Sequence, residues 1–319
     1  MDTELKFAMA VVRDAAQLAR RIQAGMASMN LTKGDLSPVT VADFALQALA
    51  GHALQQSFPD DLLVAEERAA DLDQAEPMLA AITRFLAPVV PEVTAGRVCA
   101  WIDRGGSESG ARFWTLDPID GTKGYLRGGQ YAVALALVIE GRVELGVLGC
   151  PSLGDGVMAA ARRGHGAWST PLDGEDAFTP LHVSDCRDAA AARLLRSFEK
   201  AHTNTEQIDR FVAAMGIQAP PIPMDSQAKY AVLSAGKGEL ILRFLSPDKP
   251  DYRERIWDHA AGSIIVEEAG GRVTDLDGRP LDFTTGRTLE RNRGLVVSNG
   301  HLHDMALEVL ARITRVELM

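Results

Sequence analysis

The chain opens with apolar residues that recur every three to four positions over residues 4–29, a spacing that predicts an amphipathic helix. A second helix is predicted over residues 41–56, with Asp43 in its first turn, where the helix dipole favours a carboxylate. The uninterrupted apolar run at residues 62–65 is too short for a helix and predicts a buried strand. Residues 70–95 predict a further helix that gives way to a proline-interrupted loop.

Short apolar segments separated by turn residues predict a β-sheet in the middle of the chain. Its first strand is expected to end at Asp117, because Pro118 has no N–H to donate to a sheet ladder and forces a turn. Residues 104–110, just before that strand, are rich in glycine and serine and predict a flexible loop. We expect the strands of this sheet at residues 113–116, 131–139, 143–150, 164–168 and 182–183.

Beyond about residue 185 the pattern changes to helices that alternate with strands. We therefore expect an N-terminal α+β domain over residues 1–185 and a C-terminal α/β domain over residues 186–319. The strands of the second domain are expected at residues 193–198, 240–244 and 294–298, and its helices at residues 205–215, 227–235, 258–269 and 302–314.

The composition fits a folded, acidic protein. Of 319 residues 46% are apolar and 24% charged, and 33 basic against 43 acidic residues give a net charge of −10. This excludes wholesale disorder and argues against a nucleic-acid polymer as partner, whereas a bound metal can still draw small phosphate compounds. Three cysteines without zinc-binding spacing, no signal peptide and no apolar run long enough to cross a membrane lead us to expect a cytoplasmic protein without a membrane partner.

The segment 117–122, which reads DPIDGT, is the most informative motif for chemistry. Asp117 and Asp120 stand three residues apart, so both carboxylates can converge at the carboxyl end of one strand. Gly121 and Thr122 follow with free backbone N–H groups, which attract a phosphate. Hard oxygen ligands for Mg²⁺ thus lie beside an amide cradle for an anion. A capped turn explains the same residues, because aspartate and proline favour turns in any case.

Two further acidic sites admit more than one interpretation. Glu66 and Glu67 follow the strand at residues 62–65, where adjacent carboxylates repel each other unless water or a cation lies between them. Asp258 reads as the N-cap of the helix over residues 258–269, and an aspartate at that position can also turn an oxygen towards a metal. We expect the neighbouring His259 to pack against, or support, another side chain rather than bind a metal.

Together these segments resemble the inositol monophosphatase-like superfamily of Mg²⁺-dependent, lithium-sensitive phosphatases. The resemblance runs in order through Asp43 and residues 66–67, 117–122 and 257–262, and it covers nearly the whole chain. Within this superfamily the chain is similar to the 3'(2'),5'-bisphosphate nucleotidases of the yeast and plant type. The segments that carry this narrower similarity are residues 37–40, 117–133, 224–230 and 252–259.

The resemblance implies a layered αβαβα sandwich, with metals held between the two domains. It implies that two or three Mg²⁺ ions are held by Glu66, Asp117, Asp120, Asp258 and the carbonyl of Ile119, with Glu67 as a weaker candidate. It also implies that Asp43 and Thr122 orient and deprotonate the attacking water, and that the amides of Gly121 and Thr122 stabilise the phosphate oxygens.

The nucleotide contacts implied by the resemblance come from the C-terminal domain. They are His202, Ser226, Lys229 and Arg243. The loop before His202 departs from the family's Lys-Gly-His pattern, because Ala201 replaces the glycine, and this leaves the reach of His202 in doubt.

The implied activity is hydrolysis of the 3'-phosphate of 3'-phosphoadenosine 5'-phosphate to AMP by a metal-activated water that attacks in line with the leaving sugar oxygen. The partner is then a small phosphorylated nucleotide, and the protein is a monomer or a homodimer. One alternative is an inositol phosphate phosphatase with the same metal site. A second, of another class, is a sensor that binds a phosphonucleotide without turnover; the acidic positions are all filled, which favours the enzyme.

Overall fold

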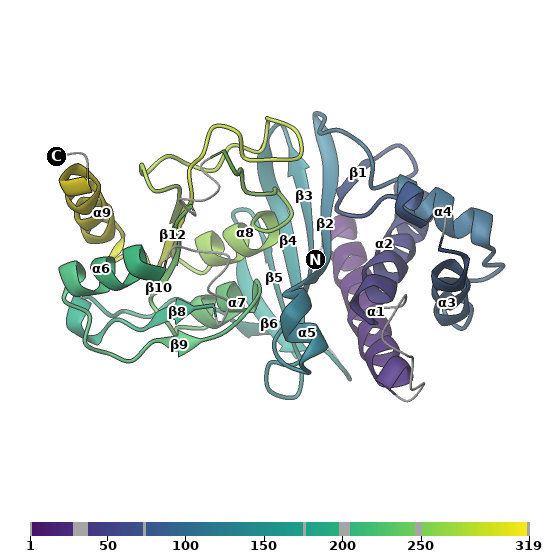
Figure 1. Cartoon of the computed structure of the whole chain (residues 1–319), viewed down its shortest axis with the longest axis horizontal. Helices are drawn as coiled ribbons and strands as arrows, with labels where there is room; N and C mark the ends of the chain where they lie inside the picture. Colours follow the sequence, from purple (N-terminus) through teal and green to yellow (C-terminus); the bar gives the residue numbers. More distant parts are fainter. Residues whose placement is uncertain are drawn as a thin grey trace.

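The computed structural model describes residues 2–27, 38–72, 75–174, 177–197, 205–245 and 251–317. Within these ranges the elements stack as five layers, in the order helices, sheet, helices, sheet, helices, which run from right to left across Figure 1. This arrangement is the αβαβα sandwich that the sequence predicts, and the prediction is confirmed. The predicted division between residues 185 and 186 falls between the two sheets.

The first sheet has seven strands that lie side by side in chain order. Its first pair, β1 and β2, is parallel, and every later pair is antiparallel. The parallel pair brings the carboxyl ends of both strands to one edge of the sheet. The strands are β1 (Leu62–Ala65), β2 (Arg112–Asp120), β3 (Ala132–Ile139), β4 (Arg142–Cys150), β5 (Val157–Arg162), β6 (Gly166–Pro171) and β7 (Thr179–Pro180).

Helices cover both faces of this sheet, and the side chains of β3 show why. Val133, Leu135 and Leu137 point into the core shared with α1 (Thr3–Ala27) and α2 (Pro38–Ser57). Three of the alternate positions, Ala132, Ala134 and Ala136, are alanines that face the core shared with α7 (Ala228–Ser234) and α8 (Ala260–Glu268). Because these alanines are small, the middle helical layer packs close to the sheet.

The second sheet separates the middle helices from an outer pair. Its strand order is β11-β12-β10-β8-β9. Side chains alternate along these strands: Ile241 faces the middle helices, whereas Leu240 and Leu242 face α6 (Thr205–Met215) and α9 (His303–Glu317). The strands are β8 (Leu194–Arg196), β9 (Ile222–Pro223), β10 (Leu240–Arg243), β11 (Arg272–Thr274) and β12 (Leu295–Ser298).

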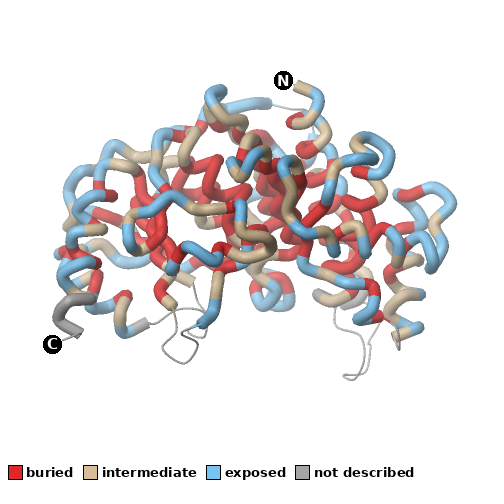
Figure 2. The backbone as a smooth tube through the Cα atoms, turned by 90° about the horizontal axis from the view of Figure 1, so that it is seen from above, coloured by how far each residue is buried: buried red, intermediate tan, exposed pale blue. Residues whose placement is uncertain are grey.

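Short helices fill the connections between the layers. On the outer side of α2 lie α3 and α4, and a Cβ at Gly51 of α2 would come 2.2 Å from the carbonyl oxygen of Trp101, which shows how closely α2 and α4 approach. Figure 2 shows the buried residues running through the middle of all five layers, with exposed residues in the connections. The short helices are η1 (Ala69–Leu72), α3 (Glu76–Leu86), α4 (Ala95–Asp103), α5 (Thr122–Leu126) and η2 (Ala189–Ala191). No helix in the described part of the chain is both long and apolar enough to cross a membrane.

Several local predictions are wrong, and three of them concern site residues. β2 does not end at Asp117 but continues to Asp120, because a bulge accommodates Pro118. α2 begins at Pro38, so Asp43 lies in its second turn. The N-cap of α8 is His259 rather than Asp258.

The other differences are in element boundaries. The helix predicted from residue 70 onward is divided into η1 and α3, and the sequence reading did not identify α4. Residues 182–183 lie outside the strands, since the sheet continues instead at β7. β5, β9 and β11 are additional strands. β9 and β11 have two and three residues, and the inner residues of β5 are all buried, so none of the three shows the alternation that marks a strand.

Close packing between α8 and the first sheet makes Gly146 of β4 a test of the layer spacing. A Cβ at this position would lie 2.7 Å from the carbonyl oxygen of Ala261 and from Cγ2 of Ile264. We expect Gly146→Ala to lower the free energy of unfolding by about 1–3 kcal/mol, as overpacking does. Gly96→Ala in α4 is the control, since a Cβ there meets nothing within 4 Å. Equal urea midpoints for the two variants would contradict the close packing.

Candidate active site

A bulge at the end of β2 brings the two aspartates of the DPIDGT motif to one side of the sheet. Asp117 pairs with Ala134 of β3 and Asp120 with Ala132, so β2 carries one extra residue over this stretch. Without that residue, side chains three positions apart would point to opposite faces. The bulge therefore re-aims Asp120 beside Asp117, and both line the same cavity.

That cavity has a volume of about 390 Å³ and lies between the two sheets, where β2, α5, α7, β8 and β10 meet (Figure 1). Both halves of the chain contribute to its wall. The candidate residues that line it are Glu66, Asp117, Ile119, Asp120, Gly121, Thr122, Ser226, Lys229, Arg243 and Asp258. The structure thus brings together most of the site residues expected from the sequence.

Two expected residues do not line the cavity, and a third lies outside the described residues. Asp43 and Glu67 are not among the described residues that line the cavity. Asp43 lies on α2 and is buried, and the charges of Glu67 and Glu66 add to the rise in its pKa that burial causes. It is also within electrostatic reach of Asp117. His202 lies outside the described residues.

The turn after β2 requires glycine for steric reasons. Gly121 has φ +90°, and a Cβ on it would lie 2.8 Å from Cβ of Ser226. A Cβ on Gly124, one turn into α5, would lie 2.0 Å from the carbonyl oxygen of Gln130. Gly121 therefore lets the turn that carries Thr122 pack against the loop before α7, and Gly124 lets α5 pack against the segment that leads to β3. Thr122 remains exposed at the cavity wall.

Burial and mutual repulsion both raise the pKa values of the carboxylates, and burial is the larger cause. Burial raises the pKa of Asp117 well above its usual range, and Asp120, Glu66 and Asp258 raise it further. Burial, Asp258 and Asp120 raise the pKa of Glu66 to about 7. Burial also raises the pKa of Asp258 to about 6, although nearby Arg243 lowers it. Oδ1 of Asp117 is buried without a hydrogen-bond partner. Several carboxylate oxygens that lie close together, one of which has no hydrogen-bond partner, suit a divalent cation such as Mg²⁺.

Lysine and arginine side chains line the same cavity, among them Lys229 and Arg243; the others are Lys123 and Arg196. Nζ of Lys229 donates to Oγ of Ser197 at 3.1 Å, and burial lowers the pKa of this lysine to about 8. Nε of Arg243 donates to Oε1 of Glu254 at 2.8 Å, and Nη2 of Arg243 lies 3.9 Å from Oδ2 of Asp258. The cavity therefore carries groups suited to a cation and groups suited to an anion.

Gln227 is a site residue that the sequence reading did not identify. Its backbone N–H donates to Oδ2 of Asp120 at 2.5 Å. Its side-chain amide donates to the carbonyl of Trp257 at 3.0 Å and accepts from the N–H of Gly262 at 3.3 Å. Gln227 therefore ties Asp120 to the start of α8. It stands inside the segment 224–230, but nothing in that segment indicates these partners.

A buried chain of hydrogen bonds supports Arg243. Oε2 of Glu254 lies 3.1 Å from Nε2 of His259, whose Nδ1 lies 2.9 Å from the hydroxyl of Tyr230. Glu254, Asp258 and His259 present ligand atoms within 4.8 Å of one another, which is close enough for a metal. However, Arg243 and His259 already engage both oxygens of Glu254, so this group is better described as an ion-pair network.

Comparison with known proteins places the chain in a family. The model of the inositol monophosphatase family matches residues 1–315, and the chain belongs to this family, as the sequence resemblance predicted. Over nearly their whole lengths, two relatives named 3'(2'),5'-bisphosphate nucleotidase are similar to it. That of Schizosaccharomyces pombe is 36% identical, over 98% of this chain and 96% of the relative. That of Oryza sativa is 40% identical, over 96% and 93%.

Solved structures share the fold. The IMPase of Thermotoga maritima superimposes with a TM-score of 0.65 at 22% identity, over 98% of this chain and 99% of the other. Staphylococcal IMPase-II gives a TM-score of 0.67 at 15% identity, over 99% and 96%. At these identities the likeness concerns the arrangement of the layers.

The raised pKa values predict how pH acts on the protein in the absence of metal. Between the ordinary value of 4.5 and about 7, Glu66 holds a proton in the folded state that it has lost in the unfolded state, so its contribution to stability falls as pH rises. We expect Glu66→Gln in EDTA to be more stable than the wild type at pH 7, by a margin that shrinks towards pH 5.

The Glu66→Gln variant has to be compared with the wild type at each pH because His303 acts in the opposite direction. Burial lowers the pKa of His303 to about 4, so its contribution to stability rises as pH rises. Differential scanning calorimetry at pH 5, 6 and 7 measures the margin. A margin that does not change with pH would contradict the proposed repulsion around Glu66. In saturating Mg²⁺ we expect the order to reverse, since the wild type then gains a ligand that the variant binds less tightly.

Proposed function

We propose that this chain hydrolyses the 3'-phosphate of 3'-phosphoadenosine 5'-phosphate to AMP and inorganic phosphate. The observation that carries the proposal is the double character of the cavity, which holds a carboxylate cluster together with Lys229 and Arg243. A nucleotide with two phosphates needs both kinds of group. The names of the relatives from Schizosaccharomyces pombe and Oryza sativa support the same substrate class.

In this proposal the carboxylates hold two or three Mg²⁺ ions. The residues that would hold them are Glu66, Asp117, Asp120, Asp258 and the carbonyl of Ile119. When bound, these ions polarise the scissile phosphate and lower the pKa of a water. Glu67 is not part of this set, since it is not among the described residues that line the cavity. Its backbone N–H donates to Oε1 of Gln47 at 2.8 Å, and Nε2 of Gln47 donates to the carbonyl of Glu67 at 2.7 Å.

Lys229 and Arg243 would bind the 5'-phosphate. Among the described residues, the hydrogen-bond partners of the Lys229 ammonium are neutral, Oγ of Ser197 and the carbonyl of Met224, so an anion that replaces them displaces no carboxylate of this part of the chain. Glu254 accepts from Nε of Arg243, and Nη2 of Arg243 lies 3.9 Å from Oδ2 of Asp258; in this proposal the terminal nitrogens of the guanidinium would donate to the phosphate. Ser226, held at φ +66° against Gly121, lies between this region and the DPIDGT turn.

Asp43 and Thr122 would handle the proton of the attacking water. The hydroxyl of Thr122 stands at the cavity wall at the start of α5. Burial and two neighbouring glutamates raise the pKa of Asp43, which makes its carboxylate a stronger base than an ordinary aspartate. We propose that Thr122 orients the water and that Asp43 receives the proton.

The test compares two substrates, with Mg²⁺ present or removed, in the wild type and in a variant that lacks the carboxylate of Asp117. Purified protein is given 3'-phosphoadenosine 5'-phosphate or inositol 1-phosphate, in Mg²⁺ or in EDTA, and phosphate release is measured. We expect release from the nucleotide in Mg²⁺, and a loss of roughly a thousandfold or more in Asp117→Asn, which keeps the shape but removes a charge. Preference for inositol 1-phosphate would support the first alternative, and tight nucleotide binding without release would support the sensor.

The substitution Lys229→Ala tests the second phosphate site. A charge-assisted contact is worth about 1.5–3 kcal/mol, so kcat/KM for 3'-phosphoadenosine 5'-phosphate should fall by about tenfold or more. Hydrolysis of 3'-AMP, which lacks the 5'-phosphate, should change little. Lys237→Ala, at an exposed lysine just after α7, is the control. Equal losses on both substrates would show that Lys229 does not recognise the 5'-phosphate.

A further inference from the structure

Arg287 lies in the long connection between β11 and β12, and its backbone is tied to the segment that leads to Asp258. Its carbonyl accepts from the N–H of Ile256 at 3.2 Å. Beside this bond, residues 255 and 288 form an antiparallel bridge, and the N–H of Leu289 donates to the carbonyl of Glu254 at 2.8 Å. The backbone at Arg287 therefore follows the chain that delivers Asp258 to the cavity.

The side chain of Arg287 reaches in the other direction, to the end of β1. Nη2 donates to the carbonyl of Ala65, the residue just before Glu66. Nη1 donates to the carbonyls of Gly105 at 3.0 Å and Ser107 at 3.2 Å. The carbonyl of Gly105 also accepts from the N–H of Ala65 at 2.9 Å, so one guanidinium clamps β1 to the loop beside it.

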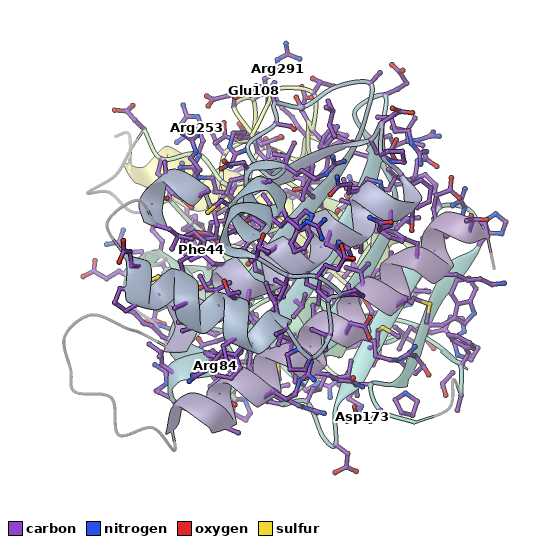
Figure 3. The ribbon with its side chains drawn as sticks, turned by 90° about the vertical axis from the view of Figure 1, so that its right-hand side faces the viewer. Phe44, Arg84, Glu108, Asp173, Arg253 and Arg291 are labelled. Atoms are coloured by element: carbon purple, nitrogen blue, oxygen red, sulfur yellow. The ribbon has the colours of Figure 1, made fainter. Side chains whose placement is uncertain are left out.

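The loop that contains Gly105 and the connection that contains Arg287 lie side by side. A Cβ at Gly286 would come 3.5 Å from Oε2 of Glu108. Figure 3 labels Glu108 of the loop and Arg291 of the connection, both near the top of the molecule. The contact thus extends over several residues of both segments.

An aromatic ring completes the link. The guanidinium carbon of Arg287 lies 5.0 Å from the ring centroid of Trp257, and that of Arg255 lies 5.7 Å from the same ring. Trp257 is buried and directly precedes Asp258. A guanidinium over an indole face is attracted by the ring quadrupole, so the position of Trp257 is coupled to that of Arg287.

We propose that Arg287 is a positioning residue that fixes Glu66 relative to Asp258, and so sets the affinity of the cavity for Mg²⁺. The two carboxylates come from segments almost 200 residues apart and repel each other, and Arg287 contacts the backbone next to both. The inference rests on the metal site of the proposed function. It assigns to Arg287 a role that requires the fork of a guanidinium, because an ammonium cannot reach three carbonyls in fixed directions.

The experiment compares Arg287→Ala and Arg287→Lys with wild type, and uses Arg291→Ala as the control. Arg291 belongs to the same connection, is largely exposed and pairs with Asp282 at 2.9 Å, so its loss removes a nearby positive charge without touching β1. Mg²⁺ binding is measured by isothermal titration calorimetry on the substrate-free protein. The unfolding temperature in EDTA and the Mg²⁺ concentration that half-activates hydrolysis are measured alongside.

We expect Arg287→Ala to raise the Kd for Mg²⁺ by on the order of tenfold or more, the cost usual for a partner that orients a metal ligand. Arg287→Lys should recover only part of the loss, and Arg291→Ala should bind Mg²⁺ as wild type does. If Arg287→Ala does not fold, Arg287→Gln, which keeps an amide donor but loses the fork and the charge, carries the same expectation.

Two outcomes would overturn the proposal. One is an unchanged Kd for Mg²⁺ in a variant whose unfolding temperature in EDTA has fallen, since Arg287 would then only stabilise the fold. The other is wild-type binding in Arg287→Lys, which would show that charge alone suffices. Failure of the proposed function is separate: a wild type that binds Mg²⁺ but releases no phosphate from the nucleotide leaves the binding comparison intact.

Discussion

Repulsion among the carboxylates at the carboxyl ends of β1 and β2 is the constraint on which this structure depends. Asp117 is 3% exposed, and the charges of Asp120, Glu66 and Asp258 all act on it. Burial of like charges costs several kcal/mol per group unless protons or a cation offset it. Several features hold these groups together against that cost, namely the five layers, the bulge in β2 and the hydrogen bonds made by Gln227 and Arg287. In the resulting geometry a divalent ion can offset the repulsion between the carboxylates.

The division of labour between the two halves of the chain follows from the same constraint. The first sheet supplies most of the groups that suit a metal, and its parallel β1–β2 pair places two of the acidic segments at one edge, while Asp258 joins them from the segment before α8. The second sheet and α7 supply Arg243 and Lys229, which suit an anion. The wall of the cavity thus combines acidic and basic groups from different layers.

Patterns along the sequence predicted most helices and strands because helix and strand periodicities are local, whereas the stacking into layers was implied by the family resemblance. The alternating face of β3 and the DPIDGT motif could be read directly from residues 131–139 and 117–122. The bulge could not, since register depends on the partner strand. The start of α2 at Pro38 had a local signal, because proline is favoured in the first helical turn, but the sequence reading began the helix at residue 41. Arg287 had none, because its partners lie about 180 and 220 residues away.

The distance along the chain between Ala65 and Arg287 has a consequence for how the protein is made. When only the first sheet has emerged from the ribosome, the acidic ends of β1 and β2 are already present, but neither Asp258 nor the guanidinium of Arg287 that clamps β1 has emerged. Closing a loop of this length carries a large entropic cost that is repaid only when the last layers dock. The acidic groups from the two halves of the chain therefore form one cavity only near the end of synthesis, after the last layers have docked.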